Sequence, residues 1–163
     1  MNASVARTFD AASTRWRPLR AEDVPVVALL EREAHIAPWT PGNFADALAA
    51  GYSMTVGVAA QGIVAYGVLL LAPGEAQLLN LTVAAGARRF GLGRALLRRF
   101  LADARHRGAE QCFLEVRVSN GPAIALYAAE GFLPVARRVA YYPPRATGER
   151  EDALVMRRSL ASS

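Results

Sequence analysis

The chain has 163 residues, of which 53% are apolar, so it can form one domain with a substantial buried core. All 19 basic residues are arginine, and the net charge of +5 would attract an anionic ligand or an acidic surface. No apolar run reaches the ~18 residues that span a bilayer, and the start lacks the apolar core of a signal peptide, so we expect a cytoplasmic protein. The single cysteine, Cys112, excludes an internal disulfide and a metal cluster of cysteines.

Residues 1–14 are small and polar, and we expect them to form a disordered tail before a single domain that covers residues 15–163. After a short edge strand over residues 16–20, acidic residues predict the start of a helix at Ala21. Thr40 and Pro41 are typical of a helix N-cap and first helical position, so a second helix follows and ends at Gly51. The apolar side of the first helix is expected to contain Val24, Val27, Leu30 and Ala34.

The rest of the chain predicts three strands, a long helix and then alternating elements. Turn signals at Gly62 and at Pro73-Gly74 favour an antiparallel meander of three strands. These strands cover residues 53–59, 62–71 and 76–83, followed by a helix over 91–108, a strand over 111–118, a helix over 120–130 and strands over 132–139 and 153–157. The order β-α-α-β-β-β-α-β-α-β-β predicts an α/β fold: a mixed sheet flanked by helices, with a strand–helix–strand crossover at its centre.

A basic, glycine-containing turn joins the third meander strand to the long helix. It reads Arg88-Arg89-Phe90-Gly91-Leu92-Gly93 and is followed by Arg94. The first turn of a helix presents unpaired N–H groups and the positive end of the helix dipole, and glycines let a bulky anion approach the backbone. This pattern predicts a phosphate or pyrophosphate site. The alternative is a tight strand-to-helix turn with solvated arginines.

The turn resembles the acetyl-CoA pyrophosphate loop of the GNAT N-acetyltransferases, and Asn120-x-x-Ala123-x-x-Leu126-Tyr127 resembles the next motif of that family. Other segments are similar to the RimI-type branch, whose members acetylate the N-terminal alanine of a small-subunit ribosomal protein. The resemblance covers about residues 16–160, with Arg88 in place of the usual glutamine and Pro122 in place of a small residue. The matching segments are Ala37-Pro38-Trp39, Leu114-Glu115-Val116-Arg117-x-Ser119-Asn120, Ala123-Ile124-Ala125-Leu126-Tyr127, Tyr141-Tyr142-Pro143 and Arg150-Glu151-Asp152-Ala153.

The resemblance implies a GNAT fold that binds acetyl-CoA as a cosubstrate and needs no metal. It implies that the backbone of Leu81, Thr82 and Val83 binds the pantetheine arm like an added strand. The pyrophosphate would be held by Arg88, Arg89, Phe90, Gly91, Leu92, Gly93 and Arg94, with Asn120 also contacting the cofactor. From the residues alone, Asn120 is equally a helix N-cap and residues 81–83 are a core strand.

Glu115 lies in a strand where Cys112, Leu114 and Val116 alternate on the opposite face. An attacking amine must be neutral, and a protein α-amine with a pKa near 8 is about a tenth neutral at pH 7, whereas a lysine is well under a thousandth neutral. A carboxylate could remove the remaining proton directly or through water. The resemblance assigns this role of general base to Glu115. The alternative is a solvated ion pair between Glu115 and Arg117.

The resemblance makes Tyr127 the general acid that protonates the departing CoA sulfur, although a helix tyrosine at this spacing is more often a core residue. Trp39, Tyr141 and Tyr142 are large aromatic residues beside prolines in expected loops. With the resemblance they are interpreted as walls of a substrate groove; the alternative is packing at its rim. His35 and His106 are isolated and receive no functional assignment.

These features predict direct transfer of an acetyl group to the α-amine of a protein, with the N-terminal alanine of a ribosomal protein as the substrate. Two alternatives remain. The acceptor could instead be lysine, a polyamine or an antibiotic amine, or the domain could be a CoA-binding adaptor without turnover. Neither membrane association nor nucleic-acid binding is expected, because no basic run carries the interleaved aromatic residues that stack on bases.

Overall fold

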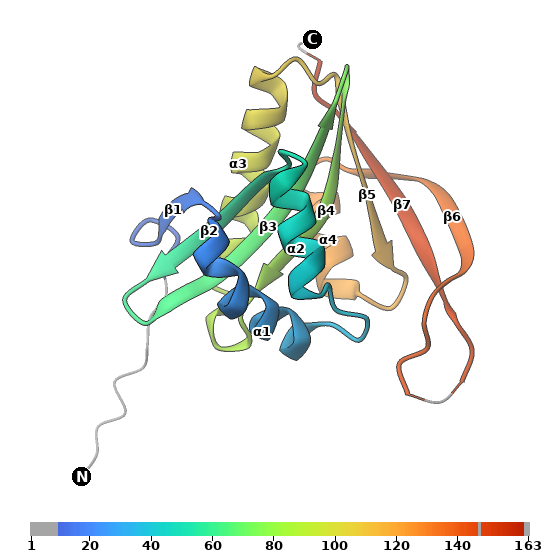
Figure 1. Cartoon of the computed structure of the whole chain (residues 1–163). Helices are drawn as coiled ribbons and strands as arrows, with labels where there is room; N and C mark the ends of the chain where they lie inside the picture. Colours follow the sequence, from blue (N-terminus) through green and yellow to red (C-terminus); the bar gives the residue numbers. More distant parts are fainter. Residues whose placement is uncertain (1–9, 147, 162–163) are drawn as a thin grey trace.

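The computed structural model describes residues 10–146 and 148–161 and contains a seven-stranded sheet in the order β1-β2-β3-β4-β5-β7-β6 (Figure 1). Neighbouring strands are antiparallel except for β4 and β5. The strands are β1 (Arg15–Pro18), β2 (Ser53–Ala59), β3 (Gly62–Ala72), β4 (Glu75–Val83), β5 (Gln111–Arg117), β6 (Leu133–Tyr142) and β7 (Glu151–Ser159). The helices are α1 (Val24–Ala34), α2 (Pro41–Ala49), α3 (Leu92–His106) and α4 (Gly121–Ala129), with 3-10 turns over Ala21–Asp23 and Ala85–Ala87.

The expected α/β class, the order of elements and the antiparallel meander are confirmed. Local signals placed the helix starts well: the Thr40 side chain accepts a hydrogen bond from the Asn43 backbone N–H, as an N-cap should. The last two strands are longer than expected. Strand β6 runs on to Tyr142, and β7 begins at Glu151, where the charged Glu151 and Asp152 hid the strand pattern.

The N-terminal segment differs in part from the expected tail. Residues 1–9 of that tail lie outside the described residues. Asp10 to Thr14, which the sequence also assigned to the tail, form a hydrogen-bonded turn in which the Thr14 backbone N–H and hydroxyl both donate to the Asp10 carbonyl. Thr14 is 7% exposed and packs near Gly57 of β2, so tertiary contact orders a stretch with no apolar pattern of its own.

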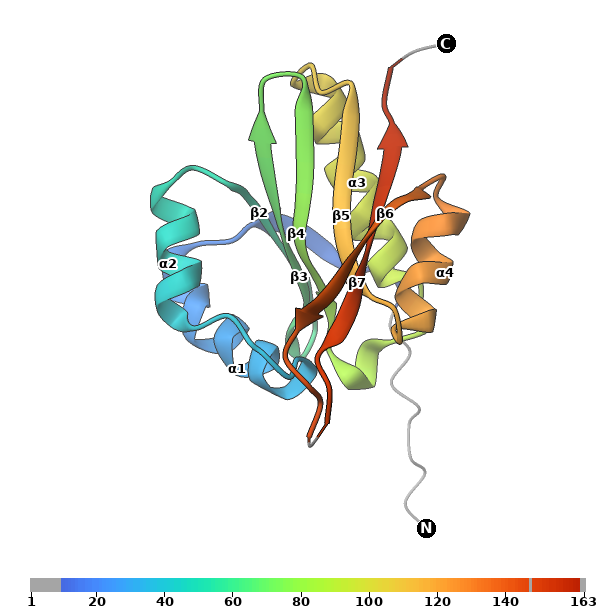
Figure 2. The same cartoon turned by 90° about the vertical axis from the view of Figure 1, so that its right-hand side faces the viewer.

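Helices cover both faces of the sheet: α1 and α2 lie on one face, and α3 and α4 on the other (Figure 2). The α1–α2 face packs around Val27, Phe44 and Tyr66, whereas the α3–α4 face packs around Phe100 and Leu114. Helix α3 approaches the sheet closely at Gly67, where the glycine leaves room for Phe100. A Cβ at this position would lie 2.5 Å from the Phe100 ring. A larger residue at position 67 would therefore push α3 off the sheet.

The buried side of α1 differs from the expected one. Its buried residues are Val24, Val27, Ala28 and Glu31, at i, i+3, i+4 and i+7. Leu30 and Ala34, which were expected on that side, are only partly buried. The stripe is therefore rotated along the helix and carries a carboxylate into the interior, an arrangement that requires hydrogen-bonding partners.

Strands β4 and β5 pair only at their first residues and then diverge. The parallel register runs from Glu75 opposite Gln111 to Leu78 opposite Leu114 and goes no further. Strand β4 has a bulge at this point, because Leu78 and Asn80 face consecutive residues of β3. The bulge leaves residues 79–83 with a backbone edge that is free on the β5 side.

Within the described ranges, no helix has the length and apolarity that a bilayer span requires. The same residues contain no group of three or more histidine, cysteine or acidic side chains placed to hold a metal ion.

Candidate active site

The basic turn before α3 presents its backbone to open space. Gly91 is the N-cap of α3 with φ of +80°, and Arg89 also has a positive φ of 71°. No side chain caps the helix, so the N–H groups of its first turn stay available. A Cβ on Gly91 would meet no atom within 4 Å, and one on Gly93 would meet only Leu126 and Val83, at 3.5 and 3.7 Å. This geometry fits a phosphate group held by backbone N–H donors.

The arginines of this turn are more engaged than the sequence suggested. The Arg88 Nε donates to the Val83 carbonyl at 3.1 Å, which ties the turn to the end of β4. Arg94 and Arg98 form ion pairs with Glu130 at 3.1 and 3.0 Å, and Arg98 in particular holds the pKa of Glu130 below its usual value. The Glu130 carboxylate therefore neutralises part of the positive charge with which Arg94 would attract an anion. Arg89 is exposed.

The free edge of β4 and the start of α4 border the same turn. The backbone groups of Leu81 and Val83 point to the side that β5 has left, where the Val83 carbonyl accepts from Arg88, whereas those of Thr82 point to β3. Asn120 is the N-cap of α4, since its Oδ1 accepts from the Ala123 N–H at 3.3 Å, so the N-cap interpretation is confirmed. An open strand edge leading to an anion-binding helix N-terminus fits a long ligand with an amide-containing arm and a pyrophosphate, the chemistry of CoA.

We predict that replacing Gly91 by valine weakens acetyl-CoA binding tenfold or more, about 1.4 kcal/mol or above. A β-branched residue disfavours φ of +80°, so the turn would change shape and its N–H donors would no longer converge. Calorimetry on the folded protein measures the effect. Gly86→Val, at an exposed glycine of the same connection, is the matched control. Equal affinities for the two variants would contradict the assignment of this turn to the cofactor.

Glu115 lies on the strand face opposite the buried Cys112, as the alternation predicted. Its Oε1 forms an ion pair with the Arg138 Nε at 2.8 Å, and its carboxylate also accepts a hydrogen bond from the Tyr141 hydroxyl. The side chain is 18% exposed, so the carboxylate is sheltered but accessible. The alternative pair with Arg117 is wrong: Arg117 instead contacts Glu151 across the β5–β7 ladder.

Arg117 has its own set of partners at the base of the β6–β7 hairpin. Its Nη1 lies 3.2 Å from Glu151 Oε1 and donates to the Pro143 carbonyl at 3.0 Å. Its guanidinium also lies over the Tyr142 ring, 4.6 Å from the centroid. Arg117 therefore packs against Tyr142 and pairs with Glu151, whereas the ion-pair partner of Glu115 is Arg138.

Tyr127 of α4 is buried, with its ring edge-on to Phe132 at 5.8 Å between centroids. Burial raises the pKa of the Tyr127 phenol well above its usual value, and the nearby Tyr142 adds to this shift. Burial also raises the pKa of Tyr142 to about 12, with a further contribution from the charge of Glu115. Tyr142 therefore lies near Tyr127 and near Glu115, the residue that follows the last paired position of β4 and β5.

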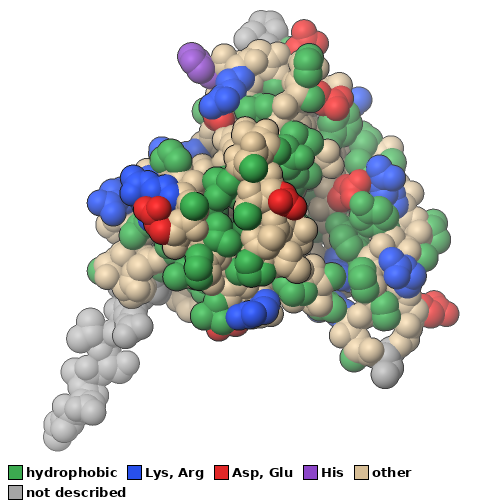
Figure 3. All heavy atoms as spheres, in the orientation of Figure 1, with side chains coloured by type: hydrophobic (Ala, Val, Ile, Leu, Met, Phe, Trp, Pro, Cys, Tyr) green, Lys and Arg blue, Asp and Glu red, His purple; other side chains and the backbone are tan. Residues whose placement is uncertain are grey.

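The three aromatic residues expected to line a substrate groove fall into two groups. Tyr141 and Tyr142 lie together, 5.1 Å between ring centroids, beside Glu115. Trp39 lies in the α1–α2 connection, packs on Phe44 at 5.2 Å and borders an open groove between α2 and β4. The molecular surface is hollowed between the α1–α2 layer and the β6–β7 hairpin (Figure 3).

A buried polar network beneath this hollow was not predicted. Glu31 is 2% exposed and accepts hydrogen bonds from the Tyr66 hydroxyl at 2.6 Å and the Asn80 amide at 3.0 Å. It also accepts from the Trp39 backbone N–H at 3.3 Å. The network therefore fixes the α1–α2 connection against β4. The available signal was a glutamate at the i+7 position of the apolar stripe that begins at Val24.

The network extends to one of the residues expected to bind the cofactor. The Thr82 hydroxyl donates to Asn80 Oδ1 at 2.7 Å and lies 2.8 Å from the His35 Nε2. Because the Thr82 proton is used, the His35 ring nitrogen donates to it. Thr82 is thus anchored by its side chain on the α1 side, while its backbone pairs with Tyr66 of β3.

Residues 18–132 match the family model described as Acetyltransferase (GNAT) family. The chain is 37% identical over 139 residues to the [ribosomal protein bS18]-alanine N-acetyltransferase of Escherichia coli, covering 85% of this chain and 92% of that protein. It is 32% identical over 142 residues to a putative [ribosomal protein bS18]-alanine N-acetyltransferase of Bacillus subtilis, covering 86% and 91%.

The fold is similar to the crystal structure of the ribosomal-protein-S18-alanine N-acetyltransferase from Escherichia coli. The TM-score is 0.85 at 33% sequence identity, over 92% of this chain and 96% of that chain. The family model spans the diverging strands β4 and β5, the glycine turn before α3, and α4, whereas the β6–β7 hairpin lies beyond its matched range. The chain therefore belongs to the GNAT acetyltransferase family.

Proposed function

We propose that this protein is an acetyl-CoA-dependent N-acetyltransferase that modifies protein N-termini, with the N-terminal alanine of ribosomal protein bS18 as its acceptor. The observation that carries the proposal is the place of Glu115, directly after the last residue pair of β4 and β5, with the Tyr141–Tyr142 ring pair beside it and Tyr127 near Tyr142. The relatives that act on this alanine match most of the chain, which supports the choice of acceptor. The proposal places the enzyme in the cytoplasm.

The bound cosubstrate supplies an acetyl group activated as a thioester, and the residues of the chain provide alignment and proton transfer. Backbone groups of residues 81–83 on the free edge of β4 would hold the extended arm, and the turn at Gly91 would hold its phosphates. A backbone N–H aimed at the thioester oxygen would stabilise the negative charge that develops there.

Glu115 is assigned the role of proton acceptor for the attacking amine. Its carboxylate pairs with Arg138, and its interaction with Tyr141 raises the pKa of that phenol; in this proposal the two residues hold the carboxylate in place for the amine. An α-amine is partly neutral at pH 7, so a single carboxylate, directly or through water, is sufficient to complete its deprotonation. Amine attack and loss of the proton to Glu115 would then occur with both substrates bound.

Tyr127 is assigned the role of proton donor to the departing sulfur. Because burial raises its pKa above the usual value, the phenol stays protonated throughout the physiological range. Direct transfer is favoured over an acetyl-cysteine route, since Cys112 is buried on the face away from Glu115. Burial also raises the pKa of the Cys112 thiol to about 12, which keeps it un-ionised and poorly nucleophilic.

Acceptor class can be tested with two peptides that differ only in which amine is free. We expect a peptide with a free N-terminal alanine to be acetylated at least tenfold faster at pH 7 than an N-terminally blocked peptide with an internal lysine. The lysine amine is almost fully protonated at this pH, and one carboxylate has little neutral amine to act on. Product mass measures both rates. Equal rates would contradict the α-amine assignment, whereas no acetylation of either would contradict activity on peptides altogether.

A further inference from the structure

The Arg150-Glu151-Asp152 segment at the start of β7 has no role in the proposed chemistry, yet its side chains hold the strand that borders Glu115. We propose that Arg150 and Asp152 are positioning residues that maintain a bulge in β6, so that Tyr141 and Arg138 reach Glu115 from the same side. This inference rests on the proposed function in one respect: it gives a catalytic consequence to the orientation of Glu115.

The bulge is defined by the register between β6 and β7. Arg138 lies opposite Ala153 and Tyr142 opposite Glu151, so the three β6 residues 139–141 face Asp152 alone. Ala140, in the middle, has φ of +51°, in the left-handed region that alanine rarely adopts. Extra residues with one in a left-handed conformation define a bulge that re-aims the side chains beyond it.

This re-aiming changes which side chains can meet. Arg138 and Tyr141 are three residues apart, and in a regular strand of period two they would point to opposite faces. With the bulge, Arg138 pairs with Glu115 through its Nε at 2.8 Å, and Tyr141 is on the same side, where interaction with the Glu115 carboxylate raises the pKa of its phenol. The Arg138 guanidinium also lies 5.5 Å from the centre of the Tyr141 ring. A straight β6 would remove one of the two contacts to Glu115.

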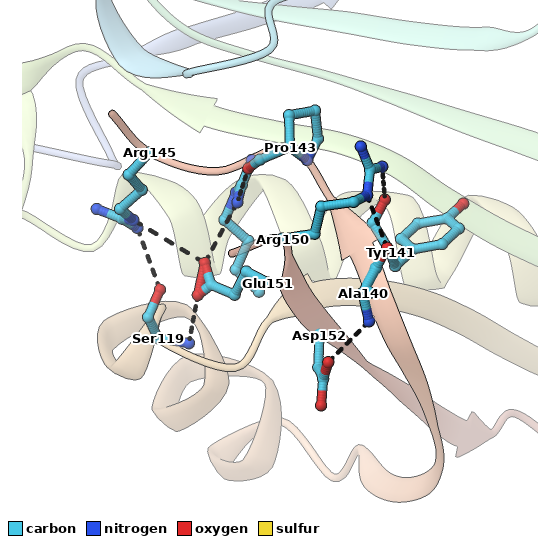
Figure 4. A network of polar contacts seen from close by, with 9 residues as sticks. Ser119, Ala140, Tyr141, Pro143, Arg145, Arg150, Glu151 and Asp152 are labelled. Carbon is cyan, nitrogen blue, oxygen red and sulfur yellow. Dashed lines mark hydrogen bonds and ion pairs between the residues drawn. The ribbon is translucent and has the colours of Figure 1, made fainter. Parts of the chain in front are cut away.

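Side chains of Asp152 in β7 and of Arg150 just before it bond the backbone groups that the bulge removes from the ladder. Asp152 Oδ1 accepts from the Ala140 N–H at 2.8 Å, and Asp152 Oδ2 pairs with the Arg137 Nε at 2.6 Å. Arg150 donates from its Nε to the Ala140 carbonyl and from its Nη2 to the Tyr141 carbonyl, both at 2.8 Å (Figure 4). The hydrogen bond from Ala140 and the pairing with Arg137 both lower the pKa of Asp152.

Glu151 secures the other side of the same hairpin. It accepts from the Ser119 backbone N–H at 3.3 Å and pairs with Arg117 and Arg145 (Figure 4). These contacts tie the hairpin to the connection between β5 and α4. The hairpin is therefore anchored at its base by Glu151, and its inward shape depends on Arg150 and Asp152.

We expect Arg150→Gln and Asp152→Ala to raise KM for an alanine-starting peptide about tenfold and to lower kcat, while KM for acetyl-CoA changes by less than about twofold. The cofactor edge of β4 and the Gly91 turn lie outside this hairpin, so they keep their shape. Arg99→Gln, at an exposed arginine of α3, is the matched control for loss of a charge. Equal changes in both KM values would indicate general destabilisation and overturn the proposal.

Two variants of Ala140 test the bulge without removing any of its side-chain contacts. Ala140→Gly favours a positive φ and is expected to keep wild-type kinetics. Ala140→Val disfavours it and should reproduce the Asp152→Ala defect. Wild-type kinetics for Ala140→Val in a folded protein would show that the bulge has no part in orienting Glu115.

A double-mutant cycle shows whether Asp152 acts through Tyr141. Tyr141→Phe should slow the wild-type enzyme severalfold and have no further effect once Asp152→Ala is present, because the hydroxyl is then already displaced. Independent, multiplicative effects of the two changes would overturn the positioning role.

A spectroscopic titration separates failure of this inference from failure of the proposed function. The hydrogen bond to Glu115 raises the pKa of Tyr141, so the phenol should ionise at lower pH when Asp152→Ala releases it. Ultraviolet difference spectra against Tyr141→Phe isolate this group and need no acceptor. An unshifted phenol would overturn the inference even in an active enzyme; a shifted phenol in a protein that acetylates no peptide would leave the bulge intact and contradict the proposed function.

Discussion

Replacing Glu115 by glutamine is expected to lower turnover on an alanine-starting peptide by about 10² to 10⁴ at pH 7. Glutamine keeps the shape of the side chain but cannot accept the proton of the attacking amine. Part of the loss should be recovered as the pH rises through the pKa of the α-amine, near 8, because more of the acceptor is then already neutral. A pH–rate profile from pH 6 to 9 measures both effects.

Three further measurements make the Glu115 result specific. Glu110→Gln changes an exposed glutamate beside the same strand and should leave turnover unchanged. Acetyl-CoA affinity, measured by calorimetry, should stay near the wild-type value in Glu115→Gln, and the melting temperature should show that the protein is folded. Near-full activity of Glu115→Gln at neutral pH would mean that Glu115 serves only as the ion-pair partner of Arg138.

Replacing Tyr127 by phenylalanine is expected to lower turnover by about 10² or more, without recovery at alkaline pH. The substitution removes only the hydroxyl and keeps the ring that packs edge-on against Phe132, so the fold should be preserved. The defect lies at the departing sulfur, and raising the pH supplies neutral amine but no proton donor. The measurement is the same pH–rate profile that is used for Glu115→Gln.

Tyr52→Phe, at a half-buried tyrosine just before β2, is the matched control for loss of a phenol. If Tyr127→Phe retained full turnover, Tyr127 would be a core residue of the α4–sheet contact, as its burial alone would suggest. If its loss were repaired at high pH, Tyr127 would act on the amine, and the roles of acid and base would need to be reassigned.

Local sequence patterns were sufficient to predict the parts of the site that depend on neighbouring residues. The alternation of Cys112, Leu114 and Val116 placed Glu115 on the opposite strand face, and the structure agrees. The Thr40 and Asn120 N-caps and the start of α3 at Gly91 also follow from residue type and spacing over a few positions. The order of elements was predictable for the same reason.

Only the tertiary structure decided which charged groups meet. Strand β7 lies between β5 and β6, and this order pairs Arg117 with Glu151 and brings Arg138 to Glu115. Arg94 likewise finds Glu130 at the far end of α4. Such partners are set by strand order and by the register between segments distant in the chain. The alternation of side chains along one strand, which suggested the pair of Glu115 and Arg117, contains no information about them.

The bulge of β6 and the buried Glu31 were also decided by tertiary contacts. A left-handed Ala140 has no local signal, since alanine prefers other conformations; it is stable because Arg150 and Asp152, ten or more residues later, bond its backbone. Glu31 of α1 can be buried because Tyr66 of β3 and Asn80 of β4 supply its hydrogen bonds. The sequence by itself therefore determined the elements and the strand face of Glu115, the proposed base. The packing of distant segments determined their partners, because burial and pairing energies depend on groups that the local pattern does not contain.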